Sequence, residues 1–244
     1  MVSMKQIIRI AILVGLLVLF ATYAMADVLN IVTLGLSPYG YYDKKNATGL
    51  SYEVGNKLAE AAGYTPNNVI APLARAVSDI ASGDADIVIM LPSPEVNKVA
   101  YNLGSVLYIE NVIIGRAETP MRSLREVRGK VLATVRGAKY DDRISKANGI
   151  ATYPTENYAQ SLKMLMAKRV DGVVGPQLGI YHAANKLRVP RRAFGKPLVL
   201  STSPARLFLS NMTVTPERVR RLRQALDLLL ENGTIKSLLE KYSL

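Results

Sequence analysis

The sequence has no cysteine, no tryptophan and only one histidine, His182. Without cysteine the chain forms no disulfide bond and no thiolate site, whatever the redox state of its compartment. One histidine cannot build a histidine-rich metal site, and it disfavours a Ser–His–Asp triad. We therefore expect no metal and no cofactor, and we assign His182, which lies in a predicted helix, a structural role.

Acidic residues are also scarce: 19 Asp and Glu stand against 31 Lys and Arg, a net charge of +12. A basic surface attracts anionic ligands, anionic lipids or nucleic acid. The first residues favour export, which disfavours a nucleic-acid partner. Lys5 and Arg9 precede the apolar run 10–26, which ends in the small-x-small triplet Ala-Met-Ala before Asp27. We predict a cleaved signal peptide over 1–26 and a periplasmic location, with an uncleaved membrane anchor as the alternative.

Short apolar, β-branched runs alternate with helical patterns through the rest of the chain. This alternation predicts an α/β fold with mainly parallel sheets and right-handed crossovers. The predicted strands cover 29–34, 67–71, 86–91, 104–115, 130–135, 151–153, 170–174, 198–200 and 205–210. The predicted helices begin near residues 50, 72, 94, 123, 141, 155, 177, 216 and 234, and the one at 141 is expected to cover 141–147.

The stretch from Asp86 to Asn97 joins a buried strand directly to a helix. The apolar run stops at Pro92, Ser93 suits the cap of a helix, and Pro94 suits its first position. Ligands of open α/β sheets lie beyond the carboxyl ends of the strands, and free N–H groups at such a turn favour an anion. The alternative is an ordinary strand–turn–helix connection.

Two extended segments, near 104–116 and 197–210, join two halves of similar α/β pattern. Two crossings between the halves predict two lobes with a cleft between them. Such a cleft is the usual place for a small-molecule site.

Several segments in order resemble one family. They are SPYGYY, TGLSYEVGNKLAEAAG, PLARAVSDIASGDADIVIM, SPEVNKVAYN, LREVRGKVLATVRGAKY, LMAKRVDGVVG and LLLENGTIKSLLEKY. Together they cover nearly all of the chain after residue 26. In this order they resemble the bacterial extracellular solute-binding proteins of family 3, the periplasmic binding proteins of the amino-acid-binding type.

The resemblance implies a type II periplasmic-binding-protein fold, in which two α/β lobes close on a ligand about a hinge. Lobe 1 is expected to comprise 27–110 and 203–244, and lobe 2 to comprise 115–198. The resemblance further implies a monomer without catalytic activity that delivers a small solute to a membrane permease, as part of an ABC-type importer.

The sequence departs from the family at both halves of its amino-acid clamp. The family's Thr-Pro-Glu-Arg segment supplies an arginine that grips the ligand carboxylate, and here that position is Val96. The family's acidic residue for the ligand amino group is here Gly175 or Pro176. Binding of an ordinary L-amino acid therefore does not follow from the resemblance.

Other side chains are candidates to replace the clamp, and they indicate a small polar or anionic solute. Arginine and lysine attract anions, tyrosines stack on flat ligands, and serine or glutamine supplies neutral hydrogen bonds. The candidate ligand-binding residues are Tyr39, Tyr42, Arg75, Leu91, Ser93, Arg136, Lys139 and Gln177. The alternative for Arg75, Arg136 and Lys139 is a solvated position on the protein surface with no role in binding.

Two other functions stay open on the same resemblance. One is a sensor module that docks on a membrane receptor. The other is a dehydratase or lyase, which needs a positioned acid or base in the cleft. The candidate carboxylates for such chemistry are Glu95, Asp141 and Asp142.

Overall fold

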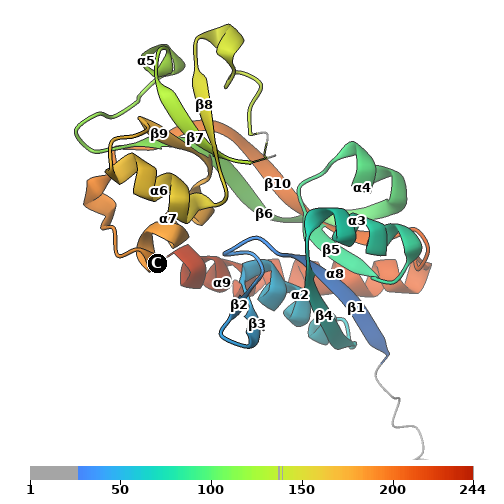
Figure 1. Cartoon of the computed structure of the whole chain (residues 1–244). Helices are drawn as coiled ribbons and strands as arrows, with labels where there is room; N and C mark the ends of the chain where they lie inside the picture. Colours follow the sequence, from blue (N-terminus) through green and yellow to red (C-terminus); the bar gives the residue numbers. More distant parts are fainter. Residues whose placement is uncertain (1–26, 137, 139, 244) are drawn as a thin grey trace, which may run out of the picture.

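The computed structural model describes residues 27–136, 138 and 140–243, so the predicted signal peptide lies outside the described residues. Its centre is an eight-stranded sheet in the order β4-β1-β5-β10-β6-β9-β7-β8 (Figure 1). The strands are β1 (Val28–Leu34), β4 (Thr65–Ala71), β5 (Ile87–Met90), β6 (Ala100–Gly115), β7 (Val131–Val135), β8 (Ala151–Thr155), β9 (Gly172–Pro176) and β10 (Leu198–Ser210). A separate hairpin joins β2 (Tyr41–Asp43) to β3 (Asn46–Thr48).

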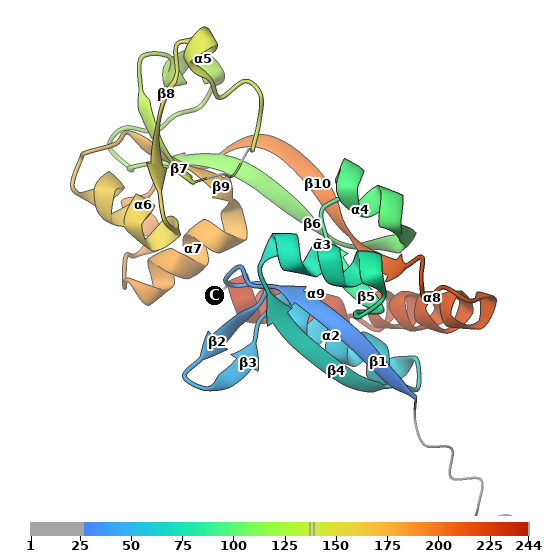
Figure 2. The same cartoon turned by 45° about the vertical axis from the view of Figure 1, so that its right-hand side comes forward.

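The helices are α2 (Leu50–Ala61), α3 (Leu73–Ser82), α4 (Pro94–Val99), α5 (Leu124–Val127), α6 (Tyr158–Met166), α7 (Gln177–Lys186), α8 (Pro216–Glu231) and α9 (Thr234–Ser243). Figures 1 and 2 show two groups of elements joined by long strands. One group contains β1, β4 and β5 with α2, α3, α4, α8 and α9. The other contains β7, β8 and β9 with α5, α6 and α7.

The first group begins with β1, α2, β4, α3 and β5, in which β1 pairs in parallel with both β4 and β5. The predicted β–α–β–α–β start is therefore confirmed. The apolar positions of α2 explain its place, because Leu50, Val54 and Leu58 lie on one face and are fully buried against the sheet. The helix α3 begins after Pro72 and ends at Gly83, whose left-handed conformation suits glycine.

The long strands β6 and β10 run antiparallel, from Ile113 opposite Leu198 to Ala100 opposite Ser210. The two ends of this strand pair pack in different hydrophobic cores. Leu103 and Leu107 of β6 pack in the first group, whereas Val112 and Ile114 pack in the second. The pair therefore belongs to both groups and is the covalent and hydrogen-bonded connection between them.

In the second group β7 pairs in parallel with β8 and β9, and β9 pairs antiparallel with β6. Its core is separate from that of the first group. It contains Leu162 and Leu165 of α6, Val173 of β9 and Ile180 of α7, all fully buried.

Two local predictions are wrong, and one hairpin was missed. Residues 141–147 form no α-helix, because the Asp141 carboxylate accepts hydrogen bonds from the Arg143 N–H and guanidinium and so favours a turn. The runs 198–200 and 205–210 are one strand, since β6 offers a continuous partner across the polar segment between them. The β2–β3 hairpin was not predicted from the sequence.

The helix α8 is fixed to the first group through Asp86, which is 3% exposed. Its carboxylate accepts hydrogen bonds from the Asn30 N–H, at 2.9 Å, and from the Arg218 guanidinium. One buried acid therefore ties β1 and the start of β5 to the first turns of α8.

This arrangement predicts different outcomes for two arginines of α8. Arg218→Ala leaves the Asp86 carboxylate buried without its cation and is expected to lower the free energy of unfolding by about 2–3 kcal/mol, less than for a fully buried pair. Arg220→Ala removes only an exposed pair with Glu217 and an exposed hydrogen bond to Gln224, and is expected to change stability little. Urea denaturation of both variants measures the difference, and equal stabilities would contradict the assigned role of Arg218.

Candidate ligand-binding cleft

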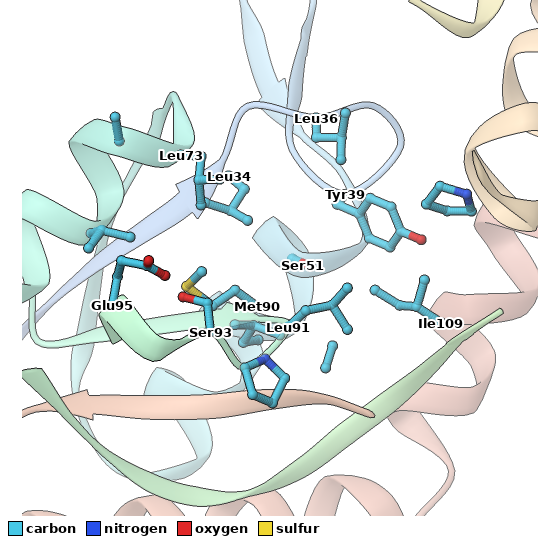
Figure 3. A pocket seen from close by; sticks show the side chains of 16 residues that line it. Leu34, Leu36, Tyr39, Ser51, Leu73, Met90, Leu91, Ser93, Glu95 and Ile109 are labelled. Carbon is cyan, nitrogen blue, oxygen red and sulfur yellow. The ribbon is translucent and has the colours of Figure 1, made fainter. Parts of the chain in front are cut away.

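A cavity of about 540 Å³ opens at the carboxyl ends of β1 and β5 (Figure 3). Its lining comes from β1 and the loop after it, α2, α3, the β5–α4 connection, β6, β9 and β10. The lining residues are Leu34, Leu36, Tyr39, Ser51, Leu73, Ala74, Val77, Ile89, Met90, Leu91, Pro92, Ser93, Glu95, Ile109, Pro176 and Ala205. Most of these residues belong to the first group of elements, and Pro176 of β9 belongs to the second.

The β5–α4 connection forms one wall of the cavity, as its strand–turn–helix pattern predicted. The strand ends at Met90, and Ser93 caps α4 by accepting a hydrogen bond from the Val96 N–H at 3.4 Å. Pro94 at the first helical position fixes the backbone there. Strand end and helix start therefore place Leu91, Pro92 and Ser93 side by side on the cavity.

The cavity is mostly apolar. Leu36 and Leu73 line it although they are 42% and 57% exposed, so part of this apolar surface faces solvent. Burial raises the pKa of the Tyr39 hydroxyl far above its ordinary value, so the phenol is neutral. The Ser93 hydroxyl and the Glu95 N–H lower the pKa of the Glu95 carboxyl, so that group is ionised at neutral pH.

The structure brings together three of the predicted ligand-binding residues, Tyr39, Leu91 and Ser93, in this cavity. Gln177 lines a neighbouring cavity of about 280 Å³, which shares Tyr39 and Ile109 with the first. Gln177 is thus close to the cavity but does not line it.

The two predicted cations that the structure describes lie elsewhere. The Arg75 side chain is 68% exposed and pairs with Asp79 one turn along α3. The Arg136 side chain is 69% exposed and pairs with Glu156 at 3.0 Å. Lys139 lies outside the described residues. The lining of the main cavity contains neither arginine.

Tyr42 also lies away from the cavity, because it is 59% exposed on the β2–β3 hairpin. Its neighbour Tyr41 packs on α7 instead, with its ring centroid 5.5 Å from that of His182 and Lys186 above its ring. Burial, followed by the charge of Lys186, lowers the pKa of His182. His182 thus lies at a contact between the hairpin and α7.

Val96 and Gly175 are closed to a ligand-binding side chain, whereas Pro176, the other candidate for the acidic clamp position, lines the cavity. Val96 is fully buried in the core between α3, α4 and the sheet, so its side chain does not face the cavity. At Gly175, an added Cβ atom would lie 2.6 Å from Cε1 and 2.7 Å from the hydroxyl oxygen of Tyr158. The Tyr158 ring, whose hydroxyl lies 2.8 Å from that of Tyr140, fills the space that a side chain at 175 would need.

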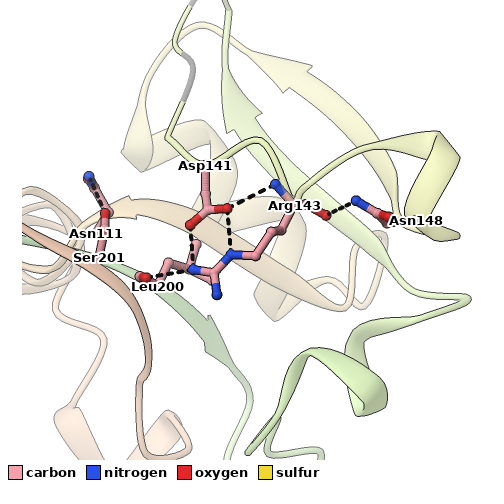
Figure 4. Close-up of polar contacts among 6 residues, drawn as sticks. All are labelled: Asn111, Asp141, Arg143, Asn148, Leu200 and Ser201. Carbon is pink, nitrogen blue, oxygen red and sulfur yellow. Dashed lines mark hydrogen bonds and ion pairs between the residues drawn. The ribbon is translucent and has the colours of Figure 1, made fainter.

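The loop after β7 is tied to β10 (Figure 4). The Arg143 guanidinium donates to the Asp141 carboxylate at 2.8 and 2.6 Å and to the Leu200 carbonyl at 2.6 Å. Hydrogen bonding by Arg143, only partly offset by burial, lowers the pKa of Asp141. Asp141 is therefore held as an ionised, hydrogen-bonded carboxylate.

No group of three or more metal-ligating side chains gathers in the part of the chain that the structure describes. Within 27–136, 138 and 140–243, no helix combines the length and the hydropathy that crossing a bilayer requires.

Residues 29–244 match the family described as bacterial extracellular solute-binding proteins, family 3. The chain belongs to this family. A sequence relative is the probable amino-acid-binding protein YxeM of Bacillus subtilis (strain 168), 24% identical over 225 residues that cover 88% of this chain and 84% of YxeM. The predicted family membership is thereby confirmed.

Solved structures share the fold of this family member at low identity. An ancestral cationic amino acid solute-binding protein superposes with a TM-score of 0.75 at 18% identity, covering 89% of this chain and 96% of its own. A histidine kinase sensor domain with similarity to periplasmic binding proteins reaches 0.69 at 17% identity, with the same coverage. The predicted α/β fold of the type II periplasmic binding proteins is confirmed.

Sequence reasoning missed most of the apolar lining. It named Leu91 but not the wall formed by α3, which Leu73, Ala74 and Val77 contribute. A signal existed, because Leu73 and Val77 are apolar at i and i+4 in a helix that follows a strand. Glu95 was named only as a candidate catalytic carboxylate.

The closure at Gly175 is testable by stability. Gly175→Ala forces a methyl group against the Tyr158 ring and is expected to lower the free energy of unfolding by about 1–3 kcal/mol, as for an overpacked core. In a Tyr158→Ala background the same change is expected to cost less, because the opposing ring is absent. A double-mutant cycle by urea denaturation measures the coupling, and additive effects would show that the ring does not close this position.

Proposed function

We propose that this chain is a periplasmic solute-binding protein that captures a small solute between two lobes and presents it to a membrane permease of an ABC-type importer. Lobe 1 comprises 27–110 and 203–244, and lobe 2 comprises 115–198. The observation that carries the proposal is the cavity itself, because Leu91 and Ser93 of lobe 1 and Pro176 of lobe 2 line the same space. A solute there contacts both lobes and favours their closed arrangement.

The lining supports a small, largely apolar solute rather than the polar or anionic one expected from the sequence. An anion in the cavity would face the ionised Glu95 without a lysine or arginine among the lining residues. Burying such a charge without a partner is unfavourable. Apolar surface, in contrast, gains free energy when it is removed from water against leucine, valine and methionine side chains.

The surroundings of the protein form part of the same proposal. A signal peptide over 1–26 would be cleaved on export, and the released protein would act as a monomer in the periplasm. Membership of an extracellular family and the match to YxeM, whose name describes amino-acid binding, support a solute-binding role.

The alternative function is a ligand-sensing module for a membrane receptor. It draws support from the fold shared with a histidine kinase sensor domain. Both functions use the same cavity and differ only in the membrane partner that recognises the closed form. A pull-down from membranes with and without ligand separates them, since it identifies either a permease or a receptor kinase.

An enzymatic function has less support from the geometry. A general acid at neutral pH needs a raised carboxyl pKa, whereas the pKa values of both Glu95 and Asp141 are lowered. The chain shares its fold with an amino-acid-binding precursor of a cyclohexadienyl dehydratase. A turnover assay with a cyclohexadienyl substrate therefore tests the enzymatic alternative.

A cavity-filling variant tests the proposed site. Ala74 lines the cavity, whereas Ala81 is exposed on the same helix and does not line it. In a thermal-shift screen of amino acids, organic acids, amines and neutral apolar solutes, bound ligands raise the melting temperature. We expect Ala74→Phe to abolish the shift and the control Ala81→Phe to retain it. A ligand that stabilises both variants equally would place the binding site elsewhere.

A further inference from the structure

Among the described residues that line the cavity, Glu95 is the single charged side chain. It lies in the first turn of α4, next to the cap residue Ser93. Figure 3 shows its carboxylate at one end of the cavity near Leu73 and Ser93, with Tyr39 and Ile109 at the other end. One end of an otherwise apolar space therefore carries a negative charge.

This carboxylate is available to a ligand. Other acids of lobe 1 are engaged in ion pairs, including Glu53 with Lys241 and Asp86 with Arg218. No lysine or arginine among the described residues lies within ion-pair distance of Glu95, which is exposed. Its hydrogen-bond partners are the Ser93 hydroxyl and its own N–H, which leave lone pairs free on a carboxylate. The charge of Lys98, on the same helix, also acts on Glu95, but from beyond ion-pair distance.

The combination selects one class of ligand. A carboxylate at an apolar wall repels an anion and adds nothing to the binding of a neutral hydrocarbon. It favours a cation whose apolar body fills the rest of the space. An ammonium group suits it best, because its three N–H donors reach the carboxylate and the Ser93 oxygen together.

We infer that the cavity is selective for amphipathic monocations, meaning protonated amines on a compact apolar body. The ammonium group lies against Glu95 and Ser93, and the body packs against Leu73, Val77 and Met90. This inference rests on the proposed function, since it names the solute class of the same cavity. It also reverses the sign of charge that the basic composition indicates.

The test uses three probes of nearly equal shape: benzylamine, benzyl alcohol and benzoate. Isothermal titration of the wild-type protein is expected to rank benzylamine first and benzoate last. Glu95→Gln is expected to weaken benzylamine binding by roughly two- to fivefold, the range for solvent-exposed ion pairs, and to leave benzyl alcohol unchanged. Added salt is expected to weaken the amine alone.

Glu126→Gln is the matched control. Glu126 lies in the first turn of α5 and accepts a hydrogen bond from the Arg122 N–H; it lies three residues after Ser123, whereas Glu95 lies two residues after Ser93. The two variants lose similar helix-start interactions, but only Glu95 lines the cavity. Loss of amine affinity in Glu95→Gln and not in Glu126→Gln supports the inference.

The outcomes separate the two levels of the proposal. If benzyl alcohol binds as tightly as benzylamine and Ala74→Phe abolishes both, the cavity is the binding site and the cation selectivity is wrong. If Glu95→Gln leaves the amine affinity unchanged, the assignment of Glu95 is wrong. If no probe binds the wild-type protein, the inference fails, and the wider screen with Ala74→Phe decides separately on the proposed function.

Discussion

The antiparallel ladder between β6 and β10 is the constraint on which the rest of the molecule depends. Each strand contributes one end to the core of the first group and the other end to apolar clusters of the second, β6 through Val112 and Ile114 and β10 through Leu200. The ladder breaks register at three places, including between Val199 and Ser201. Such irregularities bend and twist a strand pair locally. The shared strands thus connect two separately packed cores and set where their facing surfaces meet.

Electrostatics divides this protein into a basic exterior and a cavity whose described lining residues include no arginine or lysine. Arg75, Arg136 and Arg220 are more than half exposed and pair with acids on the surface. Net charge reports on solvation and on long-range attraction, not on the lining of a cavity. The basic composition therefore does not by itself indicate the charge of the ligand. The residues that matter for the ligand are few, and most of them are uncharged.

Hydrophobic periodicity predicted most of the fold because buried faces leave a clear pattern, as with Leu50, Val54 and Leu58 on α2. It failed where local polar interactions decide the backbone. The β2–β3 turn contains Lys44 with a positive φ of 56°, a position that sequence rules assign to glycine or asparagine. Asp141 favours a turn where helical spacing indicated a helix.

The same contrast holds at the site. The strand–turn–helix pattern located Leu91 and Ser93, since the carboxyl end of a parallel strand is fixed by topology. The ion pair between Arg75 and Asp79 could also be predicted from the sequence, because the two residues lie four positions apart on one helix. The sequence did not predict that Tyr158 fills the space next to residue 175, since the two residues are distant in sequence and meet only in the folded chain.

The contact between Gly175 and Tyr158 also restricts the evolutionary routes open to this protein. An acidic residue at 175 would place its Cβ atom 2.6 Å from the Tyr158 ring, so such a change is unfavourable while that ring is present. A smaller residue at 158 would make room for it, and it would also remove the contact between the Tyr140 and Tyr158 hydroxyls. An acid at 175 therefore requires a second substitution at 158, whereas Pro176, the other candidate for the acidic position, already lines the cavity.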